Sequence, residues 1–176
     1  MTGDIHEEHP FLLAPEQRDP VRRLRGRLAS GVTVLTASDG DRRAGLTVAS
    51  ILIAEGEPAR ALALVSDTSD FWYVLEESGR FVVHVLDASH REMADRFAGA
   101  VPAPGGPFVG LDISESDWGP VIGGMDTVAF ASVDDIHEVG WQQLVVADVD
   151  RIGVADLDDP LVWFRGAYRA LDEKKR

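Results

Sequence analysis

The sequence predicts a mainly β protein, an antiparallel barrel with a few short helices. Six or seven apolar runs of strand length recur along the 176 residues, separated by turn-forming residues. The regular alternation of strand and helix that builds a parallel, doubly wound sheet is absent. The glycine motifs of Rossmann and P-loop nucleotide sites are absent as well. These three observations favour a single barrel-like domain over a nucleotide-binding α/β fold.

Composition excludes several classes of function. The net charge of −13 and the isoelectric point near 4.6 oppose nonspecific binding to nucleic acid or to an anionic membrane, both of which require basic residues. The chain has no cysteine, which excludes disulfides, thiolate metal sites and cysteine nucleophiles. Five histidines form no HxH or HExxH pair, so no metal site is expected.

No targeting or membrane segment is expected. No apolar run approaches the ~18 residues that span a bilayer. The acidic start MTGDIHEEHP lacks the basic and apolar regions of a signal peptide. The sequence therefore predicts a cytoplasmic protein without membrane or nucleic-acid partners.

The chain is expected to open with a polar arm, residues 1–18, before one domain over residues 19–171. Asp19-Pro20 predicts an N-cap and a first helical residue, with Val21, Leu24 and Leu28 at helical spacing and Gly31 as the C-cap. Four arginines share this helix: Arg22, Arg23, Arg25 and Arg27. They form either a solvated face or a contact to a phosphate.

Strands are expected at 32–37 and 44–53, joined as a hairpin, and at 61–65. Residues 66–70 are a polar turn that opens a helix with apolar residues Phe71, Val74 and Leu75, ended by Gly79. The next strand, 80–86, alternates so that Val82 and His84 face away from Phe81 and Val83.

The pattern Ser89-His90-Arg91-Glu92 predicts a capping box and a short helix that ends near Gly99. A long stretch rich in Gly and Pro, 99–126, follows; connections of this length are usually functional or face a partner. Phe108 and Trp118 are expected to be exposed there and covered by a second subunit. Three strands, 128–137, 144–154 and 162–168, and a polar tail, 172–176, complete the chain.

The segment GLTVAS, residues 45–50, is the most informative part of the sequence. It places the hydroxyls of Thr47 and Ser50 in an otherwise apolar strand, after the run SGVTVLT at 30–36. Small hydroxyl residues let a flat ligand approach the backbone and bond to its polar edge. The residues alone therefore indicate a β domain with a polar ligand site.

Four segments together make the chain resemble the flavin reductase-like, FMN-binding split-barrel family. They are SGVTVLT, GLTVAS, the strand FVVHVL with the helix MADRFAG, and the closing WFRGAYRAL. The resemblance covers about residues 20–171. It implies a Greek-key split β-barrel, a homodimer with flavin near the subunit interface, and reduction of FMN or FAD by NADH or NADPH. It also implies a separate monooxygenase that receives the reduced flavin.

The resemblance assigns ligand contacts to two segments. Thr47, Val48, Ala49 and Ser50 match the part that lines the isoalloxazine ring and ribityl chain. The turn Ser66, Asp67, Thr68 and Ser69 matches the part that approaches the ribityl phosphate. The start of the following helix favours an anion independently of the resemblance. Thr68 and Ser69 could instead serve only as helix caps, and the carboxylate of Asp67 is expected to cap the helix rather than touch a phosphate.

Three further positions carry alternatives. His84 stands where relatives commonly have Asn; it either donates to a flavin edge or is a histidine satisfied within the fold. Arg91 and Arg96 are candidates for pairing with the phosphate, and Arg96 could equally be a helix-surface residue.

The chain departs from its relatives after residue 138. Where they often have Gly-Asp-His near the nicotinamide, this chain has Gly140-Trp141-Gln142. The Trp141 indole is expected to stack on a flavin or nicotinamide face or to block it.

No acid–base residue is assigned, because hydride transfer from nicotinamide to flavin needs only positioning and exclusion of water. Three functions remain open: an NAD(P)H:flavin oxidoreductase, a flavoprotein of the same fold that is not a reductase, and a dimeric barrel with a lapsed flavin site.

Overall fold

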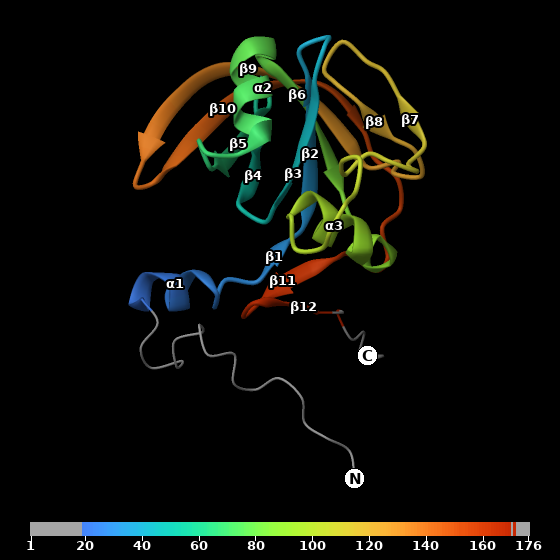
Figure 1. Cartoon of the computed structure of the whole chain (residues 1–176). Coiled ribbons are helices and arrows are strands. Elements are labelled where there is room, and N and C mark those ends of the chain that lie inside the picture. Colours follow the sequence, from blue (N-terminus) through green and yellow to red (C-terminus); the bar gives the residue numbers. More distant parts are fainter. Residues whose placement is uncertain (1–18, 170, 172–176) are drawn as a thin grey trace.

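The computed structural model describes residues 19–169 and 171, so the expected arm, 1–18, and tail, 172–176, lie outside the described residues. The fold is mainly β, as the sequence predicts (Figure 1). The helices are α1 (Pro20–Arg25), α2 (Asp70–Ser78) and α3 (Arg91–Phe97), with a 3-10 turn, η2 (Ala88–His90), before α3. None of them is long and apolar enough to cross a membrane.

Seven strands form one antiparallel sheet in the order β3-β2-β6-β9-β10-β5-β4. They are β2 (Thr33–Ser38), β3 (Arg43–Val48), β4 (Ile51–Ala54), β5 (Arg60–Val65), β6 (Arg80–Val85), β9 (Val128–Val139) and β10 (Gln142–Gly153). Two small sheets flank it: β1 (Ser30–Gly31) with β11 (Val162–Phe164) and β12 (Ala167–Arg169), and β7 (Ile113–Ser114) with β8 (Val121–Ile122).

The sheet curls into a half-barrel because β3 and β4 follow each other in the chain yet form its two opposite edges. Only Ala49 and Ser50 separate these strands. The sequence predicted one strand over 44–53, and this prediction is wrong at its centre. The chain leaves one edge at Val48 and enters the other at Ile51, so Ala49 and Ser50 form the seam where the edges meet.

Helix α2 fills the space enclosed by the curl. Its buried residues Phe71, Trp72, Val74 and Leu75 pack in one cluster with inward residues of the sheet such as Leu35 and Phe81. Ser69 caps the helix at its start, and Gly79, with a positive φ of 62°, ends it. The predicted helix is confirmed. Ser69 is its cap, and the prediction that Asp67 would cap it is wrong.

Helix α3 packs on the other face of the sheet, against β3 and β2, in a second apolar cluster. Close approach depends on Gly45, where an added Cβ would lie 2.5 Å from the Phe97 ring. The Thr47 hydroxyl donates to the Ala94 carbonyl at 2.6 Å and fastens β3 to α3. The predicted capping box at Ser89–Glu92 is wrong. The box forms earlier, between Asp87 and His90, because η2 precedes the helix.

The segment from 99 to 126 is anchored to the barrel. Phe108 packs edge to face on Phe97, and Trp118 packs on Phe130 while its indole N–H donates to Asp150 at 2.7 Å. Thr36 donates to the carbonyl of Pro120 from within the sheet. The prediction that Phe108 and Trp118 are exposed is therefore wrong: both are half-buried within their own chain, Phe108 against α3 and Trp118 against β9.

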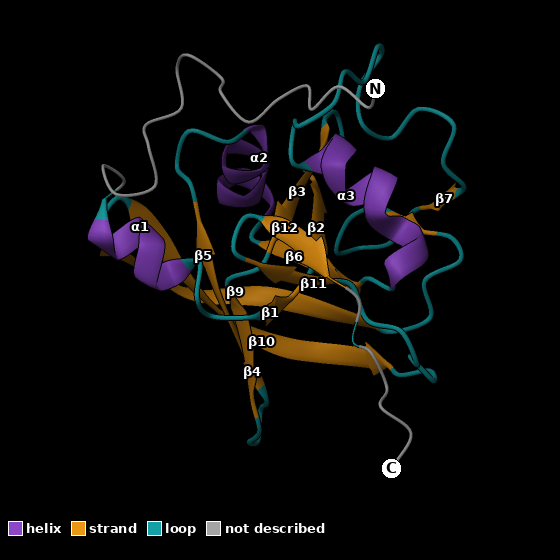
Figure 2. Cartoon of the chain, turned by 90° about the horizontal axis from the view of Figure 1, so that it is seen from below, coloured by secondary structure: helices purple, strands orange, loops and turns teal. Residues whose placement is uncertain are grey.

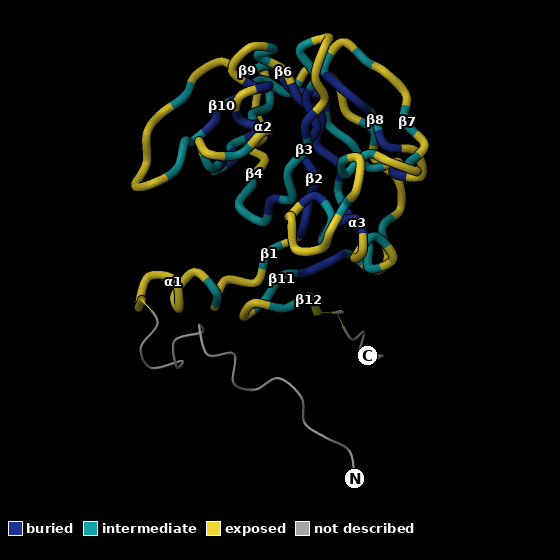
Figure 3. Tube along the Cα trace, in the orientation of Figure 1, coloured by how far each residue is buried: buried dark blue, intermediate teal, exposed yellow. Residues whose placement is uncertain are grey.

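Helix α1 begins at Pro20 behind the predicted cap Asp19, which accepts a hydrogen bond from the Val21 N–H at 2.9 Å. It ends at Arg25, earlier than predicted, because Gly26 serves as its C-cap in place of Gly31. No residue of α1 is buried. Figures 1 and 3 show it as an exposed helix standing apart from the barrel, beside β1 and β11.

Candidate functional site

The seam residues Ala49 and Ser50 lie beside the turn 66–69, as two segments of one site would. Ser50 exchanges two hydrogen bonds with Leu64, its hydroxyl donating to the Leu64 carbonyl at 3.1 Å and its carbonyl accepting from the Leu64 N–H at 3.0 Å. Leu64 stands two residues before Ser66. The fold thus brings together two segments that the sequence placed in one ligand site.

The hydroxyls and backbone of the 47–50 segment have different roles. Thr47 is committed to α3, and the buried Val48 accepts from the Thr33 hydroxyl at 3.0 Å through its carbonyl. Ala49 and Ser50 are half-buried and lie at the surface of the seam. Of the four predicted contacts, Ala49 and Ser50 are therefore the two that a ligand at the seam would meet first.

The turn 66–69 presents hydroxyls at the start of α2. Ser69 is used as the cap, accepting from the Trp72 N–H at 3.2 Å and donating to the Ser66 carbonyl at 2.8 Å. The hydroxyls of Ser66 and Thr68 bond to each other at 2.9 Å, and the Ser66 hydroxyl also accepts from the Thr68 N–H at 3.4 Å. They lie beside the N–H groups of the first helical turn, whose partial positive charge favours an anion. The turn therefore retains hydroxyl and amide donors for a phosphate.

The tip of the β9–β10 hairpin lies at the same end of the sheet, because Gln143 pairs in register with Val65. Trp141 forms the turn with Gly140 and is 92% exposed. Among the described residues, the indole lines neither the pocket beside α3 nor the one beside α1. Its expected place over a flavin stays a prediction. His137 pairs with Asp135 at 3.2 Å on β9, both exposed.

Two roles were predicted for His84, and the structure shows the structural role. Its side chain is fully buried, with Nδ1 donating to the Val34 carbonyl and Nε2 accepting from the Ile122 N–H, each at 3.1 Å. This pattern requires the neutral ring with the proton on Nδ1. Burial lowers the pKa of His84 to about 4, so the ring is neutral at pH 7. With both nitrogens used, the prediction that it donates to a flavin edge is corrected: it joins β2, β6 and β8.

Neither predicted arginine pairs with the turn 66–69. Arg91 stacks over the Tyr168 ring, 5.4 Å from its centroid, and Arg96 donates to the carbonyl of Val109 at 2.6 Å. Tyr168 is partly buried beside Asp95, and desolvation raises the pKa of its phenol to about 12. Both arginines thus help to hold α3 to neighbouring segments. A role in binding phosphate would require them to leave these contacts.

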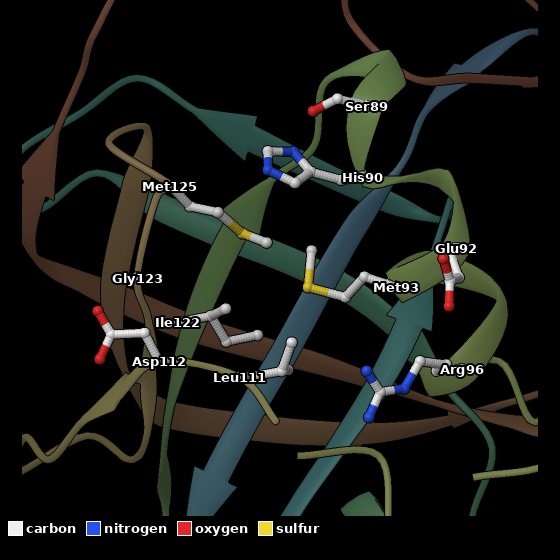
Figure 4. Close-up of a pocket in the computed structure, with 10 residues that line it drawn as sticks. All are labelled: Ser89, His90, Glu92, Met93, Arg96, Leu111, Asp112, Ile122, Gly123 and Met125. Carbon is white, nitrogen blue, oxygen red and sulfur yellow. The ribbon is translucent and has the colours of Figure 1, made fainter. Parts of the chain in front are cut away.

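An open pocket of about 280 Å³ lies between α3 and the segment 111–125 (Figure 4). Its walls include His90, Met93, Arg96, Ile122 and Met125. Apart from Arg96, sequence reasoning missed these residues. The two internal methionines were the only signal, and their convergence depends on how 111–125 folds back on α3. Among the described residues, no group of three or more His, Asp or Glu is placed to hold a metal ion.

A family model, described as a flavin reductase like domain, matches residues 25–172. The chain belongs to the flavin reductase-like family. The match includes the seam, the turn 66–69, the hairpin tip and α3, so all the predicted site residues lie within the flavin reductase-like domain.

Individual relatives agree with this assignment. The chain is 29% identical, over 93% of its length and 84% of the relative's, to the reductase subunit HsaB of a flavin-dependent monooxygenase from Rhodococcus jostii. It is 28% identical, over 85% of its length and 87% of the relative's, to an FMN reductase (NADH), RutF 2, from Methylorubrum extorquens. The crystal structure of nitrilotriacetate monooxygenase component B from Mycobacterium thermoresistibile superposes with a TM-score of 0.80 at 28% identity, covering 89% of this chain and 87% of that one.

The donor set of the flavin reductase-like chain fits a flavin phosphate and ring edge. The turn 66–69 offers two hydroxyls and the first amides of α2, and the seam offers small residues that allow close approach. An acidic chain needs such local donors, because its overall field repels a phosphate.

Proposed function

We propose that this chain is an NAD(P)H-dependent flavin reductase that uses FMN and passes the reduced flavin to a separate monooxygenase. The observation that carries the proposal is the meeting of Ala49-Ser50 with the turn 66–69 at the seam of a flavin reductase-like domain. The names of relatives, a reductase subunit of a monooxygenase and an FMN reductase (NADH), support the acceptor and the electron donor.

The protein's part in this reaction is placement. The flavin and nicotinamide supply the hydride chemistry when bound. The Ser66 and Thr68 hydroxyls and the first amides of α2 would bind the phosphate, and Ala49 and Ser50 would border the ring. The barrel beneath the seam excludes water from one side, since Val48 and Val65 are buried there. No side chain needs to hold a proton, which agrees with the absence of an assigned catalytic residue.

The flavin part of the proposal is tested by titration. Adding FMN to the protein is expected to quench flavin fluorescence with a dissociation constant in the micromolar range or tighter, about −8 kcal/mol. No saturable binding of FMN or FAD at ~100 µM would contradict every flavin function. NADH or NADPH oxidation with added FMN then separates a reductase from the second candidate, a flavoprotein with another electron donor. The hairpin residues Trp141 and Gln142 favour that second candidate, because they replace the residues common in relatives.

We further propose that the chain works as a homodimer in the cytoplasm. Large apolar side chains such as Leu52, at 71%, and Trp141 are exposed on one chain, and a second copy would cover them. Sedimentation is expected to give twice the chain mass of 19.1 kDa. A strict monomer at tens of micromolar would contradict the dimer. Cell fractionation tests the cytoplasmic location.

A further inference from the structure

The segment Pro20–Leu28, called here the basic segment, carries an apolar stripe that the described residues leave open. Val21, Leu24 and Leu28 are 71%, 67% and 65% exposed; Val21 and Leu24 share a face of α1, and Leu28 lies in the turn that follows the helix. In that turn the Leu28 N–H donates to the Arg25 carbonyl at 3.2 Å. An uncovered stripe of three large apolar side chains marks an interaction surface.

The same segment concentrates positive charge. Its four arginines stand in a chain of net charge −13. The segment is held at the turn between β11 and β12 by two contacts. The Arg165 N–H donates to the Gly26 carbonyl at 2.9 Å, and β1 pairs with β11. Figures 1 and 2 both show α1 outside the barrel. The stripe is thus presented outward rather than packed on its own sheet.

A complementary surface exists on the outside of the sheet. Leu52, Leu62 and Val146 pair across β4, β5 and β10, and Leu64 pairs with Leu144 in the neighbouring row. Leu62, Leu64, Leu144 and Val146 are half-buried and point outward, because residues next to them in the chain are buried in the core, namely Ala61, Ala63, Val65, Val145 and Ala147. Leu52 is 71% exposed beside Leu62. We call these five outward residues, Leu52, Leu62, Leu64, Leu144 and Val146, the outer apolar face. Among the described helices, α2 and α3 pack elsewhere, in the two core clusters.

Acidic residues border this face. Asp135 pairs in register with Val146 on β9. Asp134 and Asp148 flank the face as well and share Arg60 in ion pairs, while Asp135 pairs with His137. Arg80 lies in the same row as Asp148, two strands away on β6. On β9 and β10 the border therefore carries three carboxylates beside the guanidinium of Arg60. Its charge is opposite to that of the basic segment, and the apolar centre of one surface matches the apolar stripe of the other.

We propose that the basic segment of each chain docks on the outer apolar face of a second copy, in a reciprocal exchange that closes the dimer. The inference rests on the homodimer proposed above and adds its contact surfaces. Val21, Leu24 and Leu28 cover the leucines of β4, β5 and β10, while the arginines meet the carboxylates of β9 and β10. A two-fold axis makes both contacts at once, which closes the assembly at two copies.

The chain has no cysteine, so introduced thiols test the contact directly. Leu24→Cys and Leu52→Cys are made separately, mixed, equilibrated and treated with a short bis-maleimide. Because the two thiols are on different chains, a product of twice the chain mass that exceeds the product of either variant alone reports contact between copies. Val154→Cys, also at an exposed apolar residue, replaces Leu52→Cys in the control mixture. We expect at least a fivefold excess over that control.

A second measurement does not depend on thiol geometry. Leu24→Asp is expected to raise the dimer dissociation constant at least tenfold in sedimentation equilibrium, while Val154→Asp changes it less than twofold. Both sites are exposed, so both variants should keep the melting temperature of the parent. A parent dimer with neither the cross-link nor the Leu24→Asp effect overturns the docking alone. A monomeric parent overturns the docking and the dimer together, and NADH-dependent FMN reduction, assayed in the same samples, reports on the reductase separately.

Discussion

At the scale of single residues, His84 and Trp141 show how differently two unusual side chains are used. His84 is sealed inside the fold with both ring nitrogens bonded, whereas Trp141 is 92% exposed at a hairpin tip. An interior histidine of this kind affects stability, and an exposed indole near the seam is predicted to affect what can reach a bound flavin ring. Each leads to a distinct experiment.

His84 makes stability depend on pH. The pKa of His84 is about 4 in the folded chain and 6.5 in the unfolded chain. Between pH 4 and pH 6.5, therefore, the imidazole is protonated in the unfolded chain and neutral in the folded chain. The contribution of His84 to the free energy of unfolding is fully present above pH 6.5 and is lost as the pH falls towards 4. At pH 5 we expect a loss of ~2 kcal/mol relative to pH 7.5 from this residue.

The measurement is urea unfolding of the parent and of His84→Asn at pH 7.5 and pH 5. Asn keeps a hydrogen-bonding side chain but does not titrate. Carboxylates whose pKa is lowered in the folded state, such as Asp87, change the pH dependence of stability equally in both proteins. An equal loss of stability in both proteins on acidification would show that His84 is not the titrating group.

Trp141 is predicted to limit access of nicotinamide to the flavin. Replacing Trp141 by Asp and Gln142 by His restores residue types common in relatives. The double change is expected to raise NAD(P)H-dependent flavin reduction at least tenfold, which requires ~1.4 kcal/mol of barrier. The hairpin turn is exposed, so the melting temperature should not change. If the parent already turns over tens of times per second, the blocking role is wrong, and FMN binding without activity in either protein would favour the non-reductase flavoprotein.

At the scale of elements, the close contact between α3 and β3 depends on a glycine, Gly45, which has no side chain. Gly45 leaves room for the Phe97 ring, and Thr47 bonds to the Ala94 carbonyl two residues further along the strand. This contact orders the strand that ends at the seam. The long segment 99–126 is held similarly, by the packing of Phe108 and Trp118 and by the hydrogen bond of the Ile122 amide to His84.

Gly45→Ala is expected to destabilise the protein by about 1–3 kcal/mol, because the added Cβ would overlap the Phe97 ring, which is itself buried. Gly31→Ala is the matched control, since nothing lies within 4 Å of its added Cβ, and it should stay within about 0.5 kcal/mol of the parent. Urea unfolding measures both. If Gly45→Ala behaves like Gly31→Ala, the close packing of α3 does not depend on the glycine.

At the scale of the whole molecule, a curled sheet joins two distant edges, and the proposed ligand lies where they join. A ligand at that seam contacts both edges and therefore stabilises the closed sheet. FMN at 100 times its dissociation constant is expected to raise the free energy of unfolding by about 2.7 kcal/mol.

For a chain of this size, a gain of about 2.7 kcal/mol in the free energy of unfolding raises the melting temperature by roughly 5–10 °C, which circular dichroism can follow. Riboflavin, which lacks the phosphate, should bind more weakly and give a smaller shift at equal concentration. An equal shift with riboflavin would contradict the phosphate site at the turn 66–69, while leaving ring binding at the seam in place.

The sequence by itself determined the class of fold, the family and most of the elements. Apolar runs bounded by turn residues indicated the strands, and burial alternates with period two in β5 and in the middle of β10. Local capping chemistry likewise defined α1 at Asp19-Pro20 and α2 at Gly79. The two predicted ligand segments came from the family resemblance, supported by hydroxyls in an apolar strand and by a helix start, which are both local signals.

Only the tertiary structure decided how those segments meet. That Ala49 and Ser50 break one expected strand into two sheet edges depends on strand order, which pairs residues far apart in sequence. The burial of His84 and the partial burial of Phe108 and Trp118 depend on where 99–126 folds back, and the Gly- and Pro-rich sequence of this segment has no periodicity that would reveal it. Local sequence specifies the conformation and the buried face of each element, whereas the neighbours of a side chain are set by long-range pairing that no local pattern encodes.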